Sequence, residues 1–345
     1  MERVRVGVIG LGIMGQQYVK IYGALGRAEV TAVADINQER LQKVAEQYGV
    51  PHRYSDYRRM LEEAPLDAVV VATPDFAHFE PAKAVLEAGK HLAIEKPMTT
   101  STADADELLR LARSSGRKVQ VNYNHRWLGP YYYGKQAILK GEIGRPLAGF
   151  ARKNVTIFVP TEYISWAARS TPAWFLSAHD IDLLRWYFAA EPTEARAWGR
   201  REVLRQRGID TYDLIQAQVK FSSGAIATFE SAWIYPNTFP SIVDSFVEVI
   251  GTEGHLHFDR KCESIEISTP RAFNYPKNFL NAEIFGRARG AFPGCVEDFL
   301  NAIIEDREPA VTAFDGRQVT AALEAIHRSL ETGETVPVSP PPPAA

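Results

Sequence analysis

The segment GLGIMG at residues 10–15 constrains the fold most, because it joins a strand-like segment to a helix-like one. Glycines in this spacing permit a tight turn and let a pyrophosphate reach a helix N-terminus, whose free N–H groups and dipole favour an anion. A GxGxxG pattern alone also occurs in glycine-rich surface turns, but here the strand, the helix and a later acidic residue match the dinucleotide-binding fingerprint. We therefore expect a nucleotide site that includes Gly10, Gly12, Ile13, Met14 and Gly15.

Asp35 is the acidic residue of this fingerprint, and it ends the next strand-like segment, VTAVAD. A carboxylate at this point accepts hydrogen bonds from both ribose hydroxyls of NAD and repels the 2′-phosphate of NADP. Residues 36–38 are Ile, Asn and Gln, so no arginine adjoins Asp35. The sequence thus favours NAD over NADP. Asp35 could also cap the helix-like segment that follows, and the two roles are compatible.

The order of apolar segments predicts two domains of different architecture. A chain of 345 residues exceeds what one hydrophobic core usually covers. Residues 1–122 alternate strand-like and helix-like segments, which is typical of a parallel sheet covered on both faces. Residues 123–337 contain longer segments of alternating apolar and polar residues, which predict an antiparallel sheet. Residues 338–345 form a proline-rich tail that cannot build a core.

Charge and composition exclude several classes of partner. The net charge of -3 provides no basic field for nucleic acid or for an anionic membrane. No apolar run reaches the ~18 residues that a membrane helix needs, and the N-terminal residues pass from charge directly into a strand-like pattern without a cleavable signal. Two cysteines are too few for a disulfide framework or a zinc site. We expect a cytoplasmic protein without a metal.

Two further strand ends carry residues suited to the same site. The segment TPDFAH at residues 73–78 and the segment EKP at residues 95–97 each follow a buried strand-like run. In doubly wound sheets, ligands bind beyond the carboxyl ends of the strands. Pro97 restricts the backbone of Lys96 and would fix the direction of its ammonium group, although a lysine at a strand end is often simply solvated. We expect these residues near the cofactor: Thr73, Pro74, His78, Glu95, Lys96 and Pro97.

The segment WFLSAHDIDLLRW at residues 174–186 places a histidine and two aspartates at the start of a helix-like pattern. Ser177 and Asp180 have the spacing of a capping box, which favours a capping role for Asp180. Asp182 could pair with Arg185 as a structural anchor, or it could contact His179 or the substrate. His179 would lie in the first turn, where the helix dipole keeps it neutral, and a neutral histidine can act as a base.

Together, GLGIMG with Asp35, TPDFAH, EKP and HDIDLLRW resemble the glucose-fructose oxidoreductase / inositol dehydrogenase / MocA family, over nearly the whole chain up to the proline-rich tail. The resemblance implies an α/β Rossmann domain followed by an α+β domain with a large, mostly antiparallel open sheet. It also implies NAD or NADP as cofactor, a polyol substrate, and a homodimer or homotetramer built through the open sheet. In this family the residues at Lys96 and His179 face the reacting carbon.

One family feature is missing, because many active relatives have an aspartate four positions before the histidine, and this chain has Phe175 there. A histidine base relies on a partner to fix its tautomer, so the loss of the carboxylate should weaken His179. Two alternatives to a dehydrogenase stay open, the first because some members of the family it resembles use transient oxidation, the second because of Phe175. One is an NAD-dependent enzyme that cleaves glycosides by transient oxidation and elimination, and the other is a protein that binds NAD and a ligand without turnover.

The remaining candidates are suited to polyol recognition. Residues 122–127, NYNHRW, fall at the expected domain junction and combine amide, guanidinium and aromatic groups, although they could equally be packing residues. Aromatic side chains stack on sugar rings but are also common in cores. We expect an NAD-dependent oxidoreductase acting on a secondary alcohol, or the corresponding ketone, of a sugar, sugar acid or cyclitol. The expected substrate-binding residues are Asn124, Arg126, Tyr163, Trp166, Asp182 and Tyr235.

Overall fold

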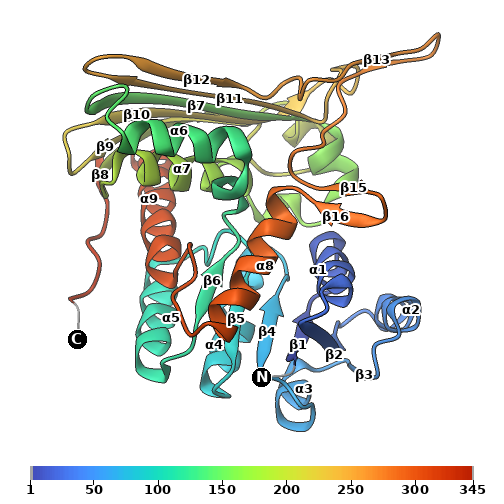
Figure 1. The fold of residues 1–345 in the computed structure, drawn as a ribbon. Helices are drawn as coiled ribbons and strands as arrows, with labels where there is room; N and C mark the ends of the chain where they lie inside the picture. Colours follow the sequence, from blue (N-terminus) through green and yellow to red (C-terminus); the bar gives the residue numbers. More distant parts are fainter. Residues whose placement is uncertain (1–2, 344–345) are drawn as a thin grey trace. The chain divides into compact units, whose positions relative to one another are not determined.

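The computed structural model describes residues 3–343, so the last two residues of the proline-rich tail, 344 and 345, lie outside it. The chain forms two compact units (Figure 1). Unit 1 comprises Met1–Tyr123 with Glu283–Arg317, and unit 2 comprises Asn124–Ala282 with Gln318–Ala345. The segment Glu283–Arg317 thus belongs to unit 1, whereas the sequence pattern placed it in the second domain.

Unit 1 is built on a parallel sheet, as its alternating sequence pattern predicts. Within the described residues, this sheet has six strands in the order β3-β2-β1-β4-β5-β6. The order reverses next to β1, and such a switch point is where doubly wound sheets bind their ligands. The strands are β1 Val4–Ile9, β2 Ala28–Ala34, β3 His52–Tyr54, β4 Ala68–Val71, β5 His91–Ile94 and β6 Val119–Val121.

Side-chain caps start three of the described helices of unit 1, at Asn37, Asp56 and Ser101. The Asn37 side chain accepts a hydrogen bond from Arg40 N at the start of α2, and Gly49 ends this helix in the left-handed conformation. Tyr18 of α1 contacts Phe292 of α8 edge to face, which attaches the C-terminal segment to the unit. These helices are α1 Ile13–Ala24, α2 Gln38–Tyr48, α3 Tyr57–Glu63, α4 Phe79–Glu87, α5 Thr102–Ser115 and α8 Ala291–Ile304, while α9 Ala313–Thr332 continues from unit 1 into unit 2.

Unit 2 contains the large, mostly antiparallel sheet, which confirms the expected fold class. Its described residues form a seven-stranded sheet in the order β12-β11-β7-β10-β9-β8-β17. Strands β7 and β10 run parallel, and the other neighbouring strands of this sheet run antiparallel. The strands are β7 Pro146–Thr156, β8 Pro192–Arg200, β9 Leu214–Phe221, β10 Ile226–Tyr235, β11 Val243–Gly251, β12 His255–Asp259 and β17 Val336–Pro337.

One face of this sheet is covered by α6 (Gly129–Leu139) and α7 (Ala178–Phe188), as Figure 1 shows. Gly149 of β7 lets α7 approach closely, because a Cβ atom there would lie 2.9 Å from the Leu184 side chain. Buried and exposed residues alternate along strand β9, so one face of the strand is buried and the other is exposed, as the sequence pattern predicts. No helix within residues 3–343 has the length and apolar character that a membrane span requires.

The remaining short elements of unit 2 are single helical turns and one hairpin. The segment that precedes α7 is irregular and includes π-helical turns at η3 and η5. The short helices are η2 Asn124–Trp127, η3 Val159–Tyr163, η4 Ala167–Arg169, η5 Ala173–Ser177 and η6 Arg205–Arg207, and the hairpin pairs β13 Ile267–Ser268 with β14 Phe273–Asn274.

Candidate active site

The glycine turn of unit 1 has the shape that a pyrophosphate needs. Gly10 has φ +85°, and a Cβ atom there would lie 2.8 Å from the backbone of Ala72. A Cβ atom on Gly15 would lie 1.9 Å from Gly10 O, so these two positions require glycine. At Gly12 the corresponding contact is 3.9 Å from an Arg40 nitrogen, so the space at the N-terminus of α1 is open. Gly12 caps α1 without a side chain, which leaves the first N–H groups to a ligand.

Asp35 lies at the end of β2 and is tied to the glycine turn. Its Oδ2 accepts a hydrogen bond from Leu11 N at 2.7 Å, and its Oδ1 accepts one from Asn37 N at 2.7 Å. The helix cap is Asn37, so the alternative in which Asp35 caps α2 is wrong. Arg40 Nε lies 3.8 Å from Asp35 Oδ2. Arg40 was not predicted to lie near Asp35, because it is not next to Asp35 in the sequence. Its side chain reaches the carboxylate from the first turn of α2.

Lys96 follows β5, and its neighbour in the sequence, Glu95, is a buried carboxylate. The Glu95 carboxylate accepts hydrogen bonds from the Tyr18 hydroxyl at 3.0 Å, from Asn122 Nδ2 at 2.5 Å and from Lys96 N at 3.2 Å. Burial raises the pKa of Glu95, although the charge of Lys96 opposes this shift. Burial lowers the pKa of Lys96, against the attraction of Glu95 and Asp75. A lysine with a lowered pKa is suited to giving or sharing a proton.

His78 joins two strand ends of unit 1. Its Nδ1 lies 2.7 Å from Pro97 O and its Nε2 lies 2.8 Å from Thr73 O. Burial lowers the pKa of His78 to about 4, so the ring is neutral near pH 7. Both nitrogens face backbone carbonyls, and the neutral ring donates its single N–H to one of them, so His78 packs between the residues that follow β4 and β5. Pro74 begins the short helix η1 (Asp75–Ala77), and the peptide bond before Pro97 is cis.

His179 occupies the first turn of α7, but the helix starts differently from the capping-box prediction. The π-helical turn η5 runs directly into α7, and Ser177 makes no side-chain cap hydrogen bond. The capping box is therefore wrong, because the preceding turn leaves no free helix end at Ser177. Asp180 instead accepts a hydrogen bond from Lys153 Nζ of β7 at 2.7 Å. Burial raises the pKa of Asp180, and the charge of Lys153 opposes the shift.

Asp182 anchors α7 to η2. Arg126 donates two hydrogen bonds to Asp182, from Nε to Oδ2 at 2.9 Å and from Nη2 to Oδ1 at 2.5 Å. The predicted pair of Asp182 with Arg185 is wrong, since Arg185 pairs with Glu191 at 2.6 Å. Asp182 is 0% exposed, so the structure favours the anchor over a direct substrate contact.

The imidazole rings of His125 and His179 stack at a centroid distance of 4.3 Å and an angle of 13°. Lys153 Nζ lies 3.4 Å and 3.5 Å from the two ring nitrogens of His125. Lys153 was not predicted as a site residue, and His125 belonged to the candidate segment NYNHRW but was given no role of its own. A signal was present, because Lys153 shares the inward register of Ala151 and Val155 on β7, and all three are buried.

Aromatic side chains occupy the place of the missing carboxylate. Phe175 is half-buried and contacts Trp166 and Trp233 at centroid distances of 5.9 Å and 6.2 Å. Tyr163 is 41% exposed, in the neighbouring helix η3. Tyr235 accepts a hydrogen bond from Asn154 Nδ2 at 2.9 Å. Phe175 thus removes an acidic side chain and adds an apolar surface one helical turn before the histidine.

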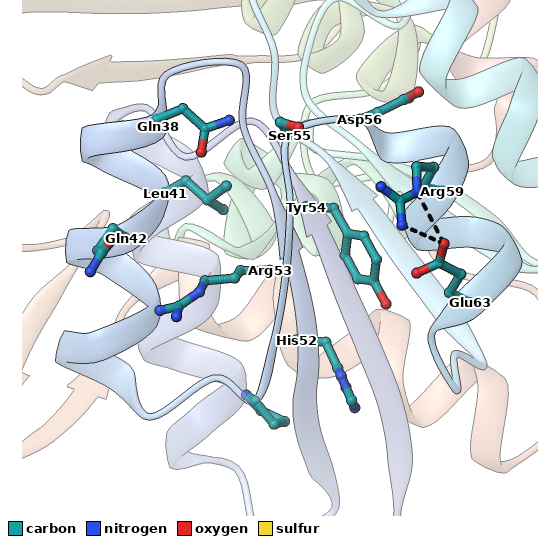
Figure 2. A pocket seen from close by; sticks show the side chains of 11 residues that line it. Gln38, Leu41, Gln42, His52, Arg53, Tyr54, Ser55, Asp56, Arg59 and Glu63 are labelled. Carbon is teal, nitrogen blue, oxygen red and sulfur yellow. Dashed lines mark hydrogen bonds and ion pairs between the residues drawn. The ribbon is translucent and has the colours of Figure 1, made fainter.

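A separate hollow of about 500 Å³ lies in unit 1 beside the edge strand β3, between α2 and α3. Figure 2 shows its polar lining, in which Arg59 and Glu63 form an ion pair. None of the predicted site residues lines it. Over residues 3–343, no group of three or more His, Cys, Asp or Glu side chains could hold a metal ion.

Two family models together cover almost the entire chain. The model described as "Oxidoreductase family, NAD-binding Rossmann fold" matches residues 4–123, and the one described as "Oxidoreductase family, C-terminal alpha/beta domain" matches residues 135–338. The chain therefore belongs to the glucose-fructose oxidoreductase / inositol dehydrogenase / MocA family of NAD-binding oxidoreductases. This confirms the resemblance drawn from the sequence motifs.

Relatives of the chain include inositol dehydrogenases. A myo-inositol 2-dehydrogenase of Thermotoga maritima is 25% identical over 96% of this chain and 98% of its own length. A scyllo-inositol 2-dehydrogenase (NAD(+)) of Bacillus subtilis is 31% identical over 74% of this chain and 73% of its own length. The fold matches that of scyllo-inositol dehydrogenase from Lactobacillus casei, solved with NAD(H) and scyllo-inositol, with a TM-score of 0.84, 23% identity and coverage of 97% and 99% of the two chains.

Proposed function

We propose that this protein is an NAD-dependent dehydrogenase that oxidises a secondary alcohol of a sugar, sugar acid or cyclitol, or reduces the corresponding ketone. The observation that carries the proposal is the supported Lys96, whose buried neighbour Glu95 is held by Tyr18 and Asn122. A buried, hydrogen-bonded carboxylate next to a lysine is typical of a catalytic site, where it fixes the position of the reacting group. A lysine that is only solvated does not need such a neighbour. The inositol dehydrogenases among the relatives make cyclitols the first substrates to test.

In the proposed chemistry, bound NAD would supply the hydride acceptor for oxidation of the alcohol, and NADH the hydride donor for reduction of the ketone. His179 removes the proton of the substrate hydroxyl, and Lys96 polarises the oxygen as the carbonyl forms. Gly12, the open N-terminus of α1 and Asp35 would hold the pyrophosphate and the ribose. The half-buried Phe175 and the exposed Tyr163 offer apolar faces to a ring of carbon atoms.

A substrate panel tests this proposal. Inositols, aldoses, ketoses and sugar acids are each incubated with NAD, and formation of NADH is followed by absorbance. We expect at least one polyol to reduce NAD. Cleavage of a glycoside without net NADH would favour the oxidation and elimination alternative. Tight NAD binding with no turnover across the panel would favour the alternative of a non-catalytic binding protein.

Cofactor choice provides a prediction about Asp35. We expect NAD to bind more tightly than NADP, because the carboxylate accepts ribose hydroxyls and repels a phosphate. Asp35→Ser should weaken NAD binding roughly 10- to 100-fold, the loss expected for hydrogen bonds to a charged group. The same change should strengthen NADP binding, since Arg40 then faces the phosphate without its nearby carboxylate.

Calorimetry with both cofactors measures these affinities, and the double variant with Arg40→Ala is the matched control. It should lose the NADP gain and keep the NAD loss. Equal affinity of the unaltered protein for both cofactors would contradict the role of Asp35.

Assembly provides a second prediction, which concerns the uncovered face of the sheet in unit 2. Trp198 is 57% exposed, Ile226 is 54% exposed and Ile250 is 46% exposed, and Ile226 and Ile250 both lie opposite Ala148 in the sheet register. Exposed apolar rows on a sheet are typical of subunit contacts. We propose a homodimer or homotetramer that buries this face.

Trp198→Glu combined with Ile226→Glu should dissociate the assembly, because charge would be buried at the contact. Leu139→Glu, on helix α6 of the covered face and 66% exposed, is the control that should leave the assembly intact. Multi-angle light scattering at micromolar concentration gives the particle mass. A mass equal to the 38.5 kDa chain for the unaltered protein would contradict the proposal.

A further inference from the structure

Four ionisable side chains from three elements of unit 2 form one contiguous group. His179 and Asp180 come from α7, His125 comes from η2, and Lys153 comes from β7. His125 contacts both Lys153 and His179, with the ammonium 3.4 Å from its Nδ1 and the second imidazole stacked at 4.3 Å. We call His125 and His179 the histidine stack.

The surroundings of His125 favour its neutral form. The Lys153 side chain is 5% exposed, and its charge is balanced by Asp180, 2.7 Å away. An ammonium beside both ring nitrogens opposes a second proton on the imidazole, because like charges repel strongly where water is excluded. Tyr131 of α6 contacts His125, and the charge of Arg260, beyond β12, acts on Tyr131 and Asp180. Arg126 and Asp182, which pair with each other, lie on the same elements as the two histidines.

A neutral ring of this kind is a good support for a base. Stacked aromatic rings fix each other's plane. When His179 takes up a proton, a neutral His125 ring tolerates the new charge on its face better than a charged imidazolium would. His125 is itself buried at 5% exposure, and its ring also contacts the Tyr131 ring at a centroid distance of 5.6 Å. The position of the stack is therefore set by the packed interior of unit 2 rather than by solvent.

We propose that His125 is a positioning residue that fixes the ring plane of His179 by stacking, in place of the carboxylate that Phe175 excludes. Lys153, held by Asp180, keeps His125 in the neutral form that this stacking requires. The inference deepens the proposed function, because it rests on His179 as the base. It also concerns an arrangement of side chains that exists without substrate, so it can be tested separately from turnover.

Kinetics of two variants at this position test the proposal on a substrate found in the panel. His125→Ala removes the stacked ring and should lower kcat roughly 10- to 100-fold, the loss expected when a catalytic group is misplaced by about 1 Å. KM and NAD affinity should change little. His125→Phe keeps a neutral flat ring and should restore most of kcat. A phenylalanine variant as slow as the alanine variant, or an alanine variant with unaltered kcat, would overturn the proposal.

NMR of protein labelled with ¹⁵N and ¹³C in its histidine rings provides a readout that needs no substrate. The His179 ring signals are assigned by comparison with His179→Gln. We expect His125→Ala to shift these signals and their pH titration, because the ring current and the neutral neighbour are lost, whereas His125→Phe should keep a ring-current shift. Unchanged His179 signals in folded His125→Ala protein would overturn the proposal. Shifted signals in a protein that oxidises no polyol would support the stack and reject the proposed function.

Discussion

Replacing His179 with alanine should lower polyol turnover by roughly two to four orders of magnitude, the usual effect of a positioned acid-base group. Lys96→Ala should have an effect of similar size, because the forming carbonyl loses its polarising group. The NAD dissociation constant should stay nearly unchanged for His179→Ala, since the histidine belongs to α7 of unit 2 and the glycine turn belongs to unit 1.

Steady-state kinetics and calorimetry separate turnover from cofactor binding. His52→Ala and Lys43→Ala, at exposed positions of unit 1, are matched controls that should keep the unaltered rates. Wild-type turnover of His179→Ala on a verified substrate would show that the histidine is only part of the helix start. Lys96 or a tyrosine would then have to transfer the proton.

Asp182→Ala should lower the free energy of unfolding by about 3–5 kcal/mol, because it leaves the Arg126 guanidinium buried without its carboxylate. Both charges are withdrawn from solvent, with side-chain exposures of 7% for Arg126 and 0% for Asp182. The pair joins η2 to α7, so its loss should also disturb the helix that carries His179. Urea unfolding of the purified protein measures the effect.

Two control variants test whether the loss of stability comes from the buried charge that is left unpaired. Asp210→Ala removes a carboxylate that is 69% exposed and should change stability by about 1 kcal/mol or less. The double variant Arg126→Leu with Asp182→Leu removes both charges and should recover much of the loss. Full stability together with a large loss of turnover in Asp182→Asn would instead show that Asp182 has taken an orienting role toward His179.

The architecture of each unit could be predicted because it depends on local periodicity. Strand-like and helix-like segments alternate through residue 122, and the resulting sheet is parallel. Alternation in segments such as LIQAQVKF predicted strands with one buried face, and β9 has this pattern. The assignment of residues 283–317 could not be made in this way, since α8 is apolar in a pattern that fits either unit. Its contact with α1 depends on packing between segments that are far apart in sequence.

The interactions around His179 show where local motifs fail. The S-x-x-D spacing at Ser177 predicts a cap only if Ser177 has the extended backbone of a free helix start. Ser177 is instead the last residue of a π-helical turn and has helical backbone angles. Arg126 and Asp182 are 56 positions apart, and Lys153 and Asp180 are 27 apart. No periodicity rule links side chains at these separations. The buried register of Lys153 was readable in the sequence of β7, but its partner was not.

The most direct test of the proposed function follows the hydrogen itself. A polyol that reduces NAD is prepared with deuterium on its carbinol carbon, and the nicotinamide product is examined by mass spectrometry after a single turnover. We predict that the deuterium appears in the reduced cofactor and that the polyol becomes the ketone, with both products lost in His179→Ala. Deuterium retained on the carbinol carbon of a sugar that has lost its leaving group, with no labelled cofactor remaining, would contradict a dehydrogenase and would support cleavage by transient oxidation.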